Sequence, residues 1–401
     1  MKAVLKPVVP VILSIALFAT GCGTQTQPAS SASGEKPDQT AQASKLPTPV
    51  TLNIATAGDT NMAELQEKAV GKDFSDKNPG VSLNIIGTGP GDAGSQTLYT
   101  KLKAQKDAGK TEWDIDVAVV HQSIMEAMIK DGLLEKFVPL SANKSYVTSA
   151  DSKNSLGTNV DGYVIPMFHS QVAIAYNPDK VKNFPADFTS LVDWIKANPK
   201  RFGYNGVKNG MSGVAFVDAY TAWKTGDYKQ LSAGPYDPKA EEKWPAVIKE
   251  LKALPVTITN GNNGTLDMLN RGEIDMGAVW VDMFTLWQNE GRMNPNFKEK
   301  LIGPGLPGQP MYVVVPKNAK NKDWAIKYAD YLTSPDVQAK VIVERNGWYP
   351  GIDANAVLGK VSEQGKKKLF TDITAADLSA KSQSFPLAKY MSDLNTAYEK
   401  N

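Results

Sequence analysis

The stretch "GYVIPMFHSQVAIAYNP", residues 162–178, is an unusually long extended run with one internal proline, Pro166. We interpret this run as a strand that leaves one lobe of the protein and enters another. A second extended run, "PGQPMYVVVPKNAKN" at 307–321, predicts a return crossing. The two crossings together predict an α/β protein of two lobes with an extended hinge between them.

Strands and helices alternate on both sides of the first crossing, and this order predicts α/β lobes. The βαβαβ order before it favours a parallel sheet covered by helices on both faces. The expected strands there are 50–56, 81–87 and 113–120, with helices at 61–80, 95–106 and 123–137. Beyond it, helices are expected at 187–202, 241–254, 323–333 and 336–346 and after Ala375, with a helix, turn and strand at 265–280.

The roughly 350 residues from Pro49 onward are too many for one small core and indicate two lobes. Ligands of open α/β sheets bind at the carboxyl ends of the strands, which places a cleft between these lobes. The expected boundaries are a signal peptide at 1–21, a tether at 22–48, an N-terminal lobe at 49–170 with 311–340, and a C-terminal lobe at 171–310 with 341–401.

The N-terminus has the layout of a secretory signal peptide. Lys2 and Lys6 precede an apolar run at 8–18, and the small residues 19–21 precede Cys22, the only cysteine in the chain. The apolar run is shorter than the roughly 20 residues of a permanent transmembrane helix. A single cysteine also excludes a disulfide framework.

The order "LFATGC" at 17–22 resembles a bacterial lipobox, although Ala19 stands where the full pattern has leucine. This resemblance implies that Cys22 is acylated and becomes the first residue of a mature lipoprotein. An ordinary signal peptide with a coincidental cysteine is the alternative. The polar segment 23–48 has almost no large apolar side chains and is expected to be a flexible tether beside the membrane.

The charge of the chain excludes one class of partner. Without Lys2 and Lys6 the chain carries 42 basic and 42 acidic residues. A protein near neutrality has no electrostatic reason to bind nucleic acid, so no nucleic-acid partner is expected.

Four further stretches follow the tether in a fixed order: "FSDKNPGVSLNI", "GYVIPMFHSQVAIAYNPDKV", "LNRGEIDMGAVWVD" and "VVVPKNAKNKDWAIKYADYLTSPDVQAKV". With the signal and the tether, this ordered set resembles an extracellular solute-binding protein of a bacterial ABC importer. The similarity runs from about residue 50 to about residue 355. It is strongest to the branch that contains polyamine, thiamine, iron and phosphonate binders, and looser to sugar binders.

The resemblance implies a type II periplasmic-binding-protein fold that closes over a small molecule and delivers it to a membrane permease. Ligand contacts to both lobes exist only in the closed form, so binding shifts the hinge equilibrium towards closure. The implied protein is a monomer without a cofactor, anchored through Cys22 at the extracytoplasmic face of the cell membrane.

The loop "GTGPGDAG" at 87–94 has GxGxxG spacing between a strand and a helix. A dinucleotide site would need an acidic residue at the end of the next strand, which here ends in Val120-His121. The loop instead offers backbone N–H groups to a ligand, with Thr88 and Gly89 as candidate contacts. A plain connecting turn is the alternative.

His121 and His169 are the only histidines, and they have no nearby cysteine with which to form a structural zinc site. Both fall where the fold places the mouth of the cleft, so they are candidate ligand contacts or else partly buried structural residues. Asp59 and Asn61, after the first strand, are candidates of the same kind.

The stretch "VWVDMFTLW" at 279–287 carries Trp280 at the end of a buried strand and Asp282 two residues later. An aromatic residue at this position faces the ligand in the polyamine-like branch. A tryptophan face and a carboxylate would suit a cationic or hydroxylated ligand. The alternative is that Trp280 fills the core and Asp282 caps the next helix.

The remaining candidate contacts lie on a second-lobe helix, at the second crossing and after a late helix. Tyr312 lies where polyamine binders have an aromatic residue followed by an aspartate, but "MYVVVP" lacks that aspartate. These remaining candidate contacts are Asp218, Tyr220, Tyr312, Trp348 and Tyr349. The expected ligand is a small polar molecule, cationic or polyhydroxylated.

Two other classes of protein are alternatives to a binding protein. An exported enzyme on the same fold would need a paired nucleophile and base, or a metal cluster, and nothing pairs a serine with either histidine. No catalytic residue and no metal site is therefore expected. An anchored scaffold protein would have a cleft filled by its own side chains.

Overall fold

The computed structural model describes residues 46–401. The signal peptide, Cys22 and most of the tether lie outside these residues. The strands are β1 (Val50–Thr56), β2 (Val81–Gly87), β3 (Val117–Val120), β4 (Asn154–Ser155), β5 (Thr158–Asn159), β6 (Ile165–Tyr176), β7 (Phe202–Tyr204), β8 (Thr257–Ile258), β9 (Met276–Trp280), β10 (Lys298–Lys300), β11 (Leu306–Val314), β12 (Tyr349–Pro350) and β13 (Ser382–Gln383).

The helices cover this framework, and most of them belong to strand–helix units. They are α1 (Thr60–Glu64), α2 (Lys72–Lys77), α3 (Gly91–Asp107), α4 (Met125–Lys130), α5 (Phe188–Ala197), α6 (Met211–Thr225), α7 (Tyr228–Ala233), α8 (Trp244–Ala253), α9 (Gly261–Asn270), α10 (Val281–Asn289), α11 (Lys322–Leu332), α12 (Pro335–Val337), α13 (Ala354–Leu358), α14 (Glu363–Leu369), α15 (Ala375–Lys381) and α16 (Ala388–Lys400). Two π-helical segments, Leu65–Gly71 and Gln338–Arg345, continue α1 and α12.

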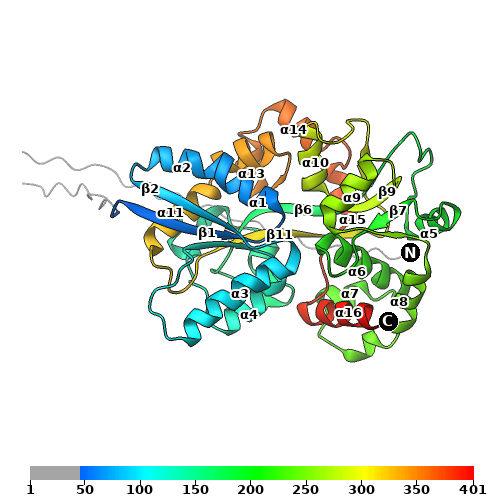
Figure 1. Cartoon of the computed structure of the whole chain (residues 1–401), viewed down its shortest axis with the longest axis horizontal. Helices are drawn as coiled ribbons and strands as arrows, with labels where there is room; N and C mark the ends of the chain where they lie inside the picture. The colour runs from blue at the N-terminus through cyan, green and yellow to red at the C-terminus, as the bar shows by residue number, and fades with distance from the viewer. Residues whose placement is uncertain (1–45) are drawn as a thin grey trace, which may run out of the picture. The chain divides into compact units, whose positions relative to one another are not determined.

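The main sheet has the strand order β2-β1-β3-β11-β6-β9-β7-β8. β1 is parallel to β2 and β3, and β7 is parallel to β8 and β9. β6 and β11 lie in the middle of this order, antiparallel to each other, and connect the two parallel halves (Figure 1). The long run at 162–178 is therefore one strand of 12 residues, and its partner is the predicted return crossing.

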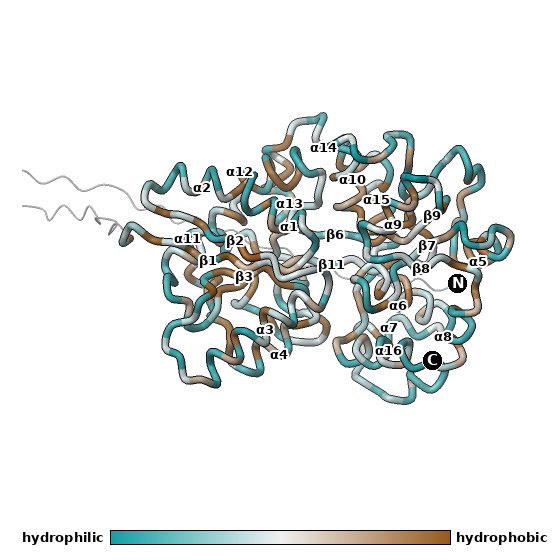
Figure 2. The backbone as a smooth tube through the Cα atoms, in the orientation of Figure 1, coloured by the Kyte–Doolittle hydropathy of each residue, from teal (hydrophilic) through white to brown (hydrophobic). Residues whose placement is uncertain are grey.

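The apolar core divides on either side of these two strands, and Figure 2 shows hydrophobic residues along the inner strands with hydrophilic ones on the outer turns. We call the part whose buried apolar residues run from Leu52 to Phe168 and from Met311 to Leu369 the first lobe. The second lobe has its clusters from Val172 to Leu306 and from Phe385 to Tyr398. Residues 341–369 thus pack in the first cluster, whereas the sequence assigned them to the C-terminal lobe.

Most predicted elements are present, and two differences have local causes. The strand expected at 113–120 begins only at Val117, because Trp113 makes an isolated bridge to Ala319 instead. Helix α5 begins one residue later than expected, at Phe188, because Asp187 is its N-cap. The Asp187 carboxylate accepts the Ser190 backbone N–H at 2.8 Å, and the Ser190 hydroxyl accepts the Asp187 N–H at 3.2 Å, which is a capping box.

Within residues 46–401, none of the helices combines the length and the apolar character that crossing a bilayer requires.

Candidate functional site

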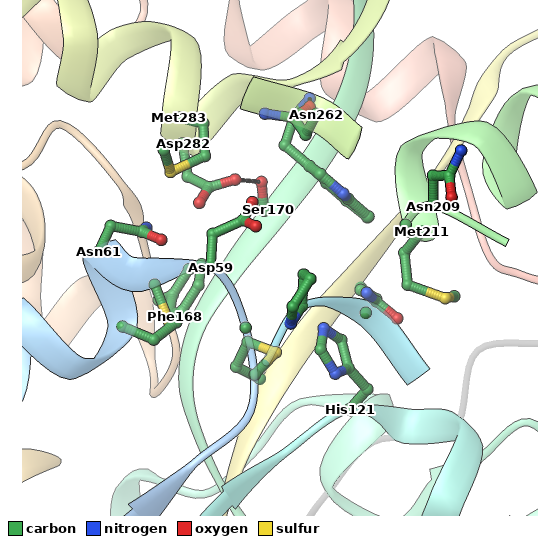
Figure 3. Close-up of a pocket in the computed structure, with 18 residues that line it drawn as sticks. Asp59, Asn61, His121, Phe168, Ser170, Asn209, Met211, Asn262, Asp282 and Met283 are labelled. Atoms are coloured by element: carbon green, nitrogen blue, oxygen red, sulfur yellow. Dashed lines mark hydrogen bonds between the residues drawn. The ribbon is translucent and has the colours of Figure 1, made fainter. Parts of the chain in front are cut away.

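A pocket of about 560 Å³, counting its opening to solvent, lies on one face of β6 and β11 (Figure 3). Both lobes contribute to its wall, so the pocket occupies the interlobe position that the sequence predicted for the cleft. Its lining residues are Gly58, Asp59, Asn61, Met62, Pro90, Gly91, His121, Phe168, Ser170, Asn209, Gly210, Met211, Asn262, Trp280, Asp282, Met283, Gln309 and Met311.

Helix N-termini converge on this pocket, because parallel strands end at the same edge and each is followed by a helix. Asp59 is the residue before α1, Gly91 begins α3, and Gly210 precedes α6. Trp280 ends β9 and precedes α10, whose first turn contains Asp282. The Trp280 backbone N–H donates to Asn262 Oδ1 at 2.7 Å, which joins α9 to the same wall.

The two lobes touch at the edge of the pocket, where glycine faces glycine. A Cβ atom placed on Gly91 would lie 3.3 Å from Gly210 Cα, and both residues have positive φ, +58° and +139°. Any side chain here would separate α3 from α6 or strain the backbone. The structure therefore has the two lobes of the protein in contact beside the pocket.

Two carboxylates give the pocket its charge. Asp282 accepts a hydrogen bond from the Ser170 hydroxyl, and its backbone oxygen accepts the Trp348 indole N–H at 2.8 Å. Burial, with the charge of Asp59 adding to it, raises the pKa of Asp282 to about 6. Burial likewise raises the pKa of Asp59. No lysine or arginine is among the described residues that line the pocket, so the buried charge is negative.

His121 is held by a serine. Its Nδ1 lies 3.0 Å from Ser95 Oγ, and its backbone N–H donates to the same oxygen at 3.1 Å. Burial lowers the pKa of His121, although Asp92 nearby opposes this, so the imidazole is neutral at physiological pH. A neutral ring leaves the negative charge of the two carboxylates uncancelled.

Much of the remaining wall is apolar, and these apolar residues were not among the predicted contacts. Four methionines and the ring of Phe168 surround the carboxylates; the methionines are Met62, Met211, Met283 and Met311. A signal for Phe168 and Ser170 was present in β6, because side chains of a strand point alternately to opposite faces. Phe168 and Ser170 line this pocket, whereas His169 and Gln171 line a cavity on the other face.

The structure brings five of the predicted contact residues together in the pocket: Asp59, Asn61, His121, Trp280 and Asp282. Thr88 and Gly89 lie just outside the lining; the Thr88 hydroxyl donates to Thr56 O at 3.2 Å and Gly94 O at 3.0 Å. The loop that contains them is a tight turn, because a Cβ on Gly94 would lie 2.0 Å from Gly89 O.

Other predicted contacts are buried in the lobes. Tyr312 has no exposed surface, and its hydroxyl donates to Asp151 O at 2.6 Å. Trp348 packs on Phe168 with ring centroids 4.6 Å apart. Asp218 and Tyr220 lie on α6, whose residues from Met211 to Ala222 are all buried. His169 and Tyr349 line the cavity on the other face of β6.

Among residues 46–401, no group of three or more histidine, cysteine or carboxylate side chains is placed to hold a metal ion. The expectation that no serine pairs with a histidine is wrong for Ser95 and His121, but Ser95 has no exposed surface and does not line the pocket. The chemistry of the pocket is recognition by charge, stacking and apolar contact.

Residues 69–390 match the model of a family described as bacterial extracellular solute-binding proteins. The spermidine/putrescine-binding periplasmic protein of Salmonella typhimurium is 25% identical over 278 residues, covering 66% of this chain and 70% of that protein. The protein of the same name from Escherichia coli is 26% identical over 277 residues, with the same coverage of both chains.

Solved structures show the same fold at low identity. A spermidine/putrescine ABC transporter substrate-binding protein from Streptococcus pneumoniae superposes with a TM-score of 0.61 at 15% identity, covering 87% of this chain and 98% of that one. The maltose-bound MalE3 of T. maritima superposes at 0.67 with 17% identity and coverages of 87% and 93%. The two-lobed α/β fold and the resemblance inferred from the sequence are thus confirmed: this chain belongs to the family of bacterial extracellular solute-binding proteins.

Proposed function

We propose that this protein captures a small aliphatic amine in the interlobe pocket and delivers it to the permease of an ABC importer. The observation that carries the proposal is the pair of a partly buried Asp59 and a buried Asp282 in a pocket whose described lining residues include no lysine or arginine. Burial without a counter-ion is costly for a carboxylate, which the raised pKa of Asp282, to about 6, reflects. A bound ammonium group would supply the missing charge.

The apolar part of the pocket suits the carbon chain of such a ligand. Methionine side chains are unbranched and adapt to irregular shapes, so four of them can follow a run of methylene groups. The face of Trp280 offers cation–π attraction to an ammonium group that lies over it. Relatives named as spermidine- or putrescine-binding proteins agree with this class of ligand.

Closure of the lobes supports delivery to a permease. Asp59 belongs to the first lobe and Asp282 to the second, so a cation between them holds both lobes only in the closed form. The contact of Gly91 with Gly210 would then be part of the surface that a permease distinguishes from the open form.

We also propose that the protein is a monomer anchored by an acylated Cys22, with a lobe boundary within each crossing strand, near 170 and near 310. A Cys22→Ala variant tests the anchor: it should leave the membrane fraction and lose incorporation of labelled palmitate. Retention of the label in that variant would overturn the proposal of acylation at Cys22.

The ligand class is tested by thermal unfolding of the full chain in detergent with putrescine, spermidine, thiamine, a phosphonate, maltose and ferric citrate. A ligand at 100 times its dissociation constant adds about 2.7 kcal/mol to the free energy of unfolding. We expect this stabilisation from an aliphatic amine, and we expect Asp282→Asn to remove it. Stabilisation by a sugar or an anion alone would overturn the proposal.

A further inference from the structure

A second cavity lies on the other face of the crossing strands. It measures about 1330 Å³, counting its opening to solvent, against about 560 Å³ for the pocket described above. The alternation along β6 divides its side chains between the two: Phe168 faces the first pocket, whereas His169 and Gln171 face the second cavity. We call the second one the rear cavity.

A thin wall separates the rear cavity from the first pocket. Ser170 and Gln309, opposite each other on β6 and β11, line both. Trp280 of the first pocket packs on Phe385 of the rear cavity, with ring centroids 6.5 Å apart. The two spaces therefore have separate linings and share only these backbone and ring contacts.

One side of the rear cavity is apolar and partly aromatic. Tyr349 and Phe370 are stacked, with ring centroids 6.1 Å apart and an interplanar angle of 23°. Leu358 of α13 and Leu378 of α15 extend this side. A flat apolar body can lie against such a surface, where aromatic stacking adds to area burial.

The rear cavity also carries one charged group. Asp151 is half-exposed at the cavity, 3.8 Å from Nδ1 of His169. Burial lowers the pKa of His169, so at neutral pH the ring does not neutralise this carboxylate. The Gln309 side chain is no second acceptor here, because it lies opposite Ser170 and shares with Met311 the face of the first pocket. The described lining again includes no lysine or arginine.

The amide of Gln171, on the floor of the cavity, is already hydrogen-bonded within the protein. Gln171 Nε2 donates to Leu306 O at 2.7 Å, and its Oε1 accepts the Ser382 hydroxyl at 2.6 Å. These bonds tie β6 to β11 and β13 and fix the shape of the floor. The group left for a ligand is therefore the Asp151 carboxylate.

We propose that the rear cavity is a second binding site, for a small cation with an aromatic body, an arylalkylammonium ion. The ring lies against Tyr349, Phe370 and Leu378, and the ammonium group donates to the Asp151 carboxylate. The site does not depend on what the first pocket binds, because apart from Ser170 and Gln309 the two linings are distinct.

The test is isothermal titration of the full chain in detergent with phenethylamine. Asp151→Asn keeps the shape of the side chain and removes the charge, while Leu378→Trp fills the apolar side. Asp59→Asn is the matched control, because it removes a carboxylate from the first pocket only. Far-UV circular dichroism and the unfolding temperature show that each variant is folded.

We expect phenethylamine to bind the wild type with one site and Asp59→Asn to change its affinity less than twofold. Loss of a charged hydrogen-bond partner should weaken binding about tenfold or more in Asp151→Asn. Leu378→Trp should abolish binding. The proposal is overturned if the wild type does not bind, if Asp59→Asn loses binding, or if Asp151→Asn binds as the wild type does.

Discussion

Asp59 and Asp282 reach the same pocket from different lobes, and the charge of Asp59 adds to burial in raising the pKa of Asp282 to about 6. In the ligand-free protein this pair is held together against its own repulsion. A cation between the two carboxylates would offset this repulsion. The protein with a filled pocket is therefore expected to be more stable than the protein with an empty one.

Asp282→Asn should stabilise the ligand-free protein at neutral pH. The usual pKa of 3.8 is raised in the folded state, so this group contributes stability that is fully present below pH 3.8 and lost as pH rises to about 6. A shift of roughly two units corresponds to about 3 kcal/mol as an upper figure. Urea unfolding should show that the variant lacks the decline of the wild type between these pH values; an equal decline in both would contradict the role of Asp282.

Amine binding should weaken as the pH falls below about 6, because a protonated Asp282 no longer pairs with an ammonium group. The dissociation constant of putrescine, measured by titration calorimetry over a pH series, should rise through this range. In Asp282→Asn the binding should be weak at every pH. A pH-independent dissociation constant in the wild type would rule out carboxylate recognition at this position.

Substitutions of the two tryptophans near Asp282 should distinguish an effect on ligand binding from an effect on folding. Trp280 lines the pocket, so Trp280→Ala should remove most of the stabilisation by an amine while the protein stays folded. Trp348 is 1% exposed and contacts Phe168, so Trp348→Ala should lower the free energy of unfolding by about 3–5 kcal/mol. Urea unfolding with and without putrescine distinguishes them, and an unaltered amine response in Trp280→Ala would remove that residue from the site.

Gly91→Ala should disturb the closed form. The new Cβ would press on Gly210 Cα from 3.3 Å, so the lobes should close less tightly and putrescine should dissociate faster. Gly109→Ala is the matched control: its φ of +68° is similar to the +58° of Gly91, but a Cβ there meets nothing within 4 Å. Both variants carry the backbone strain of a positive φ, and stopped-flow dissociation should change only in Gly91→Ala. Equal rates in the two variants would show that this contact does not govern closure.

The strands and helices that hold the site followed from sequence, because periodicity and turn residues are local signals. β1 and β2 begin and end where the pattern placed them, and β6 is the continuous crossing that 162–178 indicated. Trp280 and Asp282 were found because a strand end followed by a helix start identifies the edge where ligands bind.

What the sequence did not reveal was the face on which a crossing residue lies. Tyr312 was expected in the cleft, yet its neighbours Met311 and Gln309 point there and Tyr312 points into the first lobe. One residue of register decides the face, and register depends on pairing with β6, which has a bulge beside Met311. Asp218 shows the same limit for a helix, since α6 is buried on all sides and has no polar face to read.

The alternation of β6 also bears on how such a receptor can diverge. Adjacent residues of this one strand line two different cavities. A substitution at 168 therefore alters the first pocket, whereas a substitution at 169 alters the rear cavity. Selection can therefore change the lining of one cavity while β6, which lines both, keeps its pairing and its length.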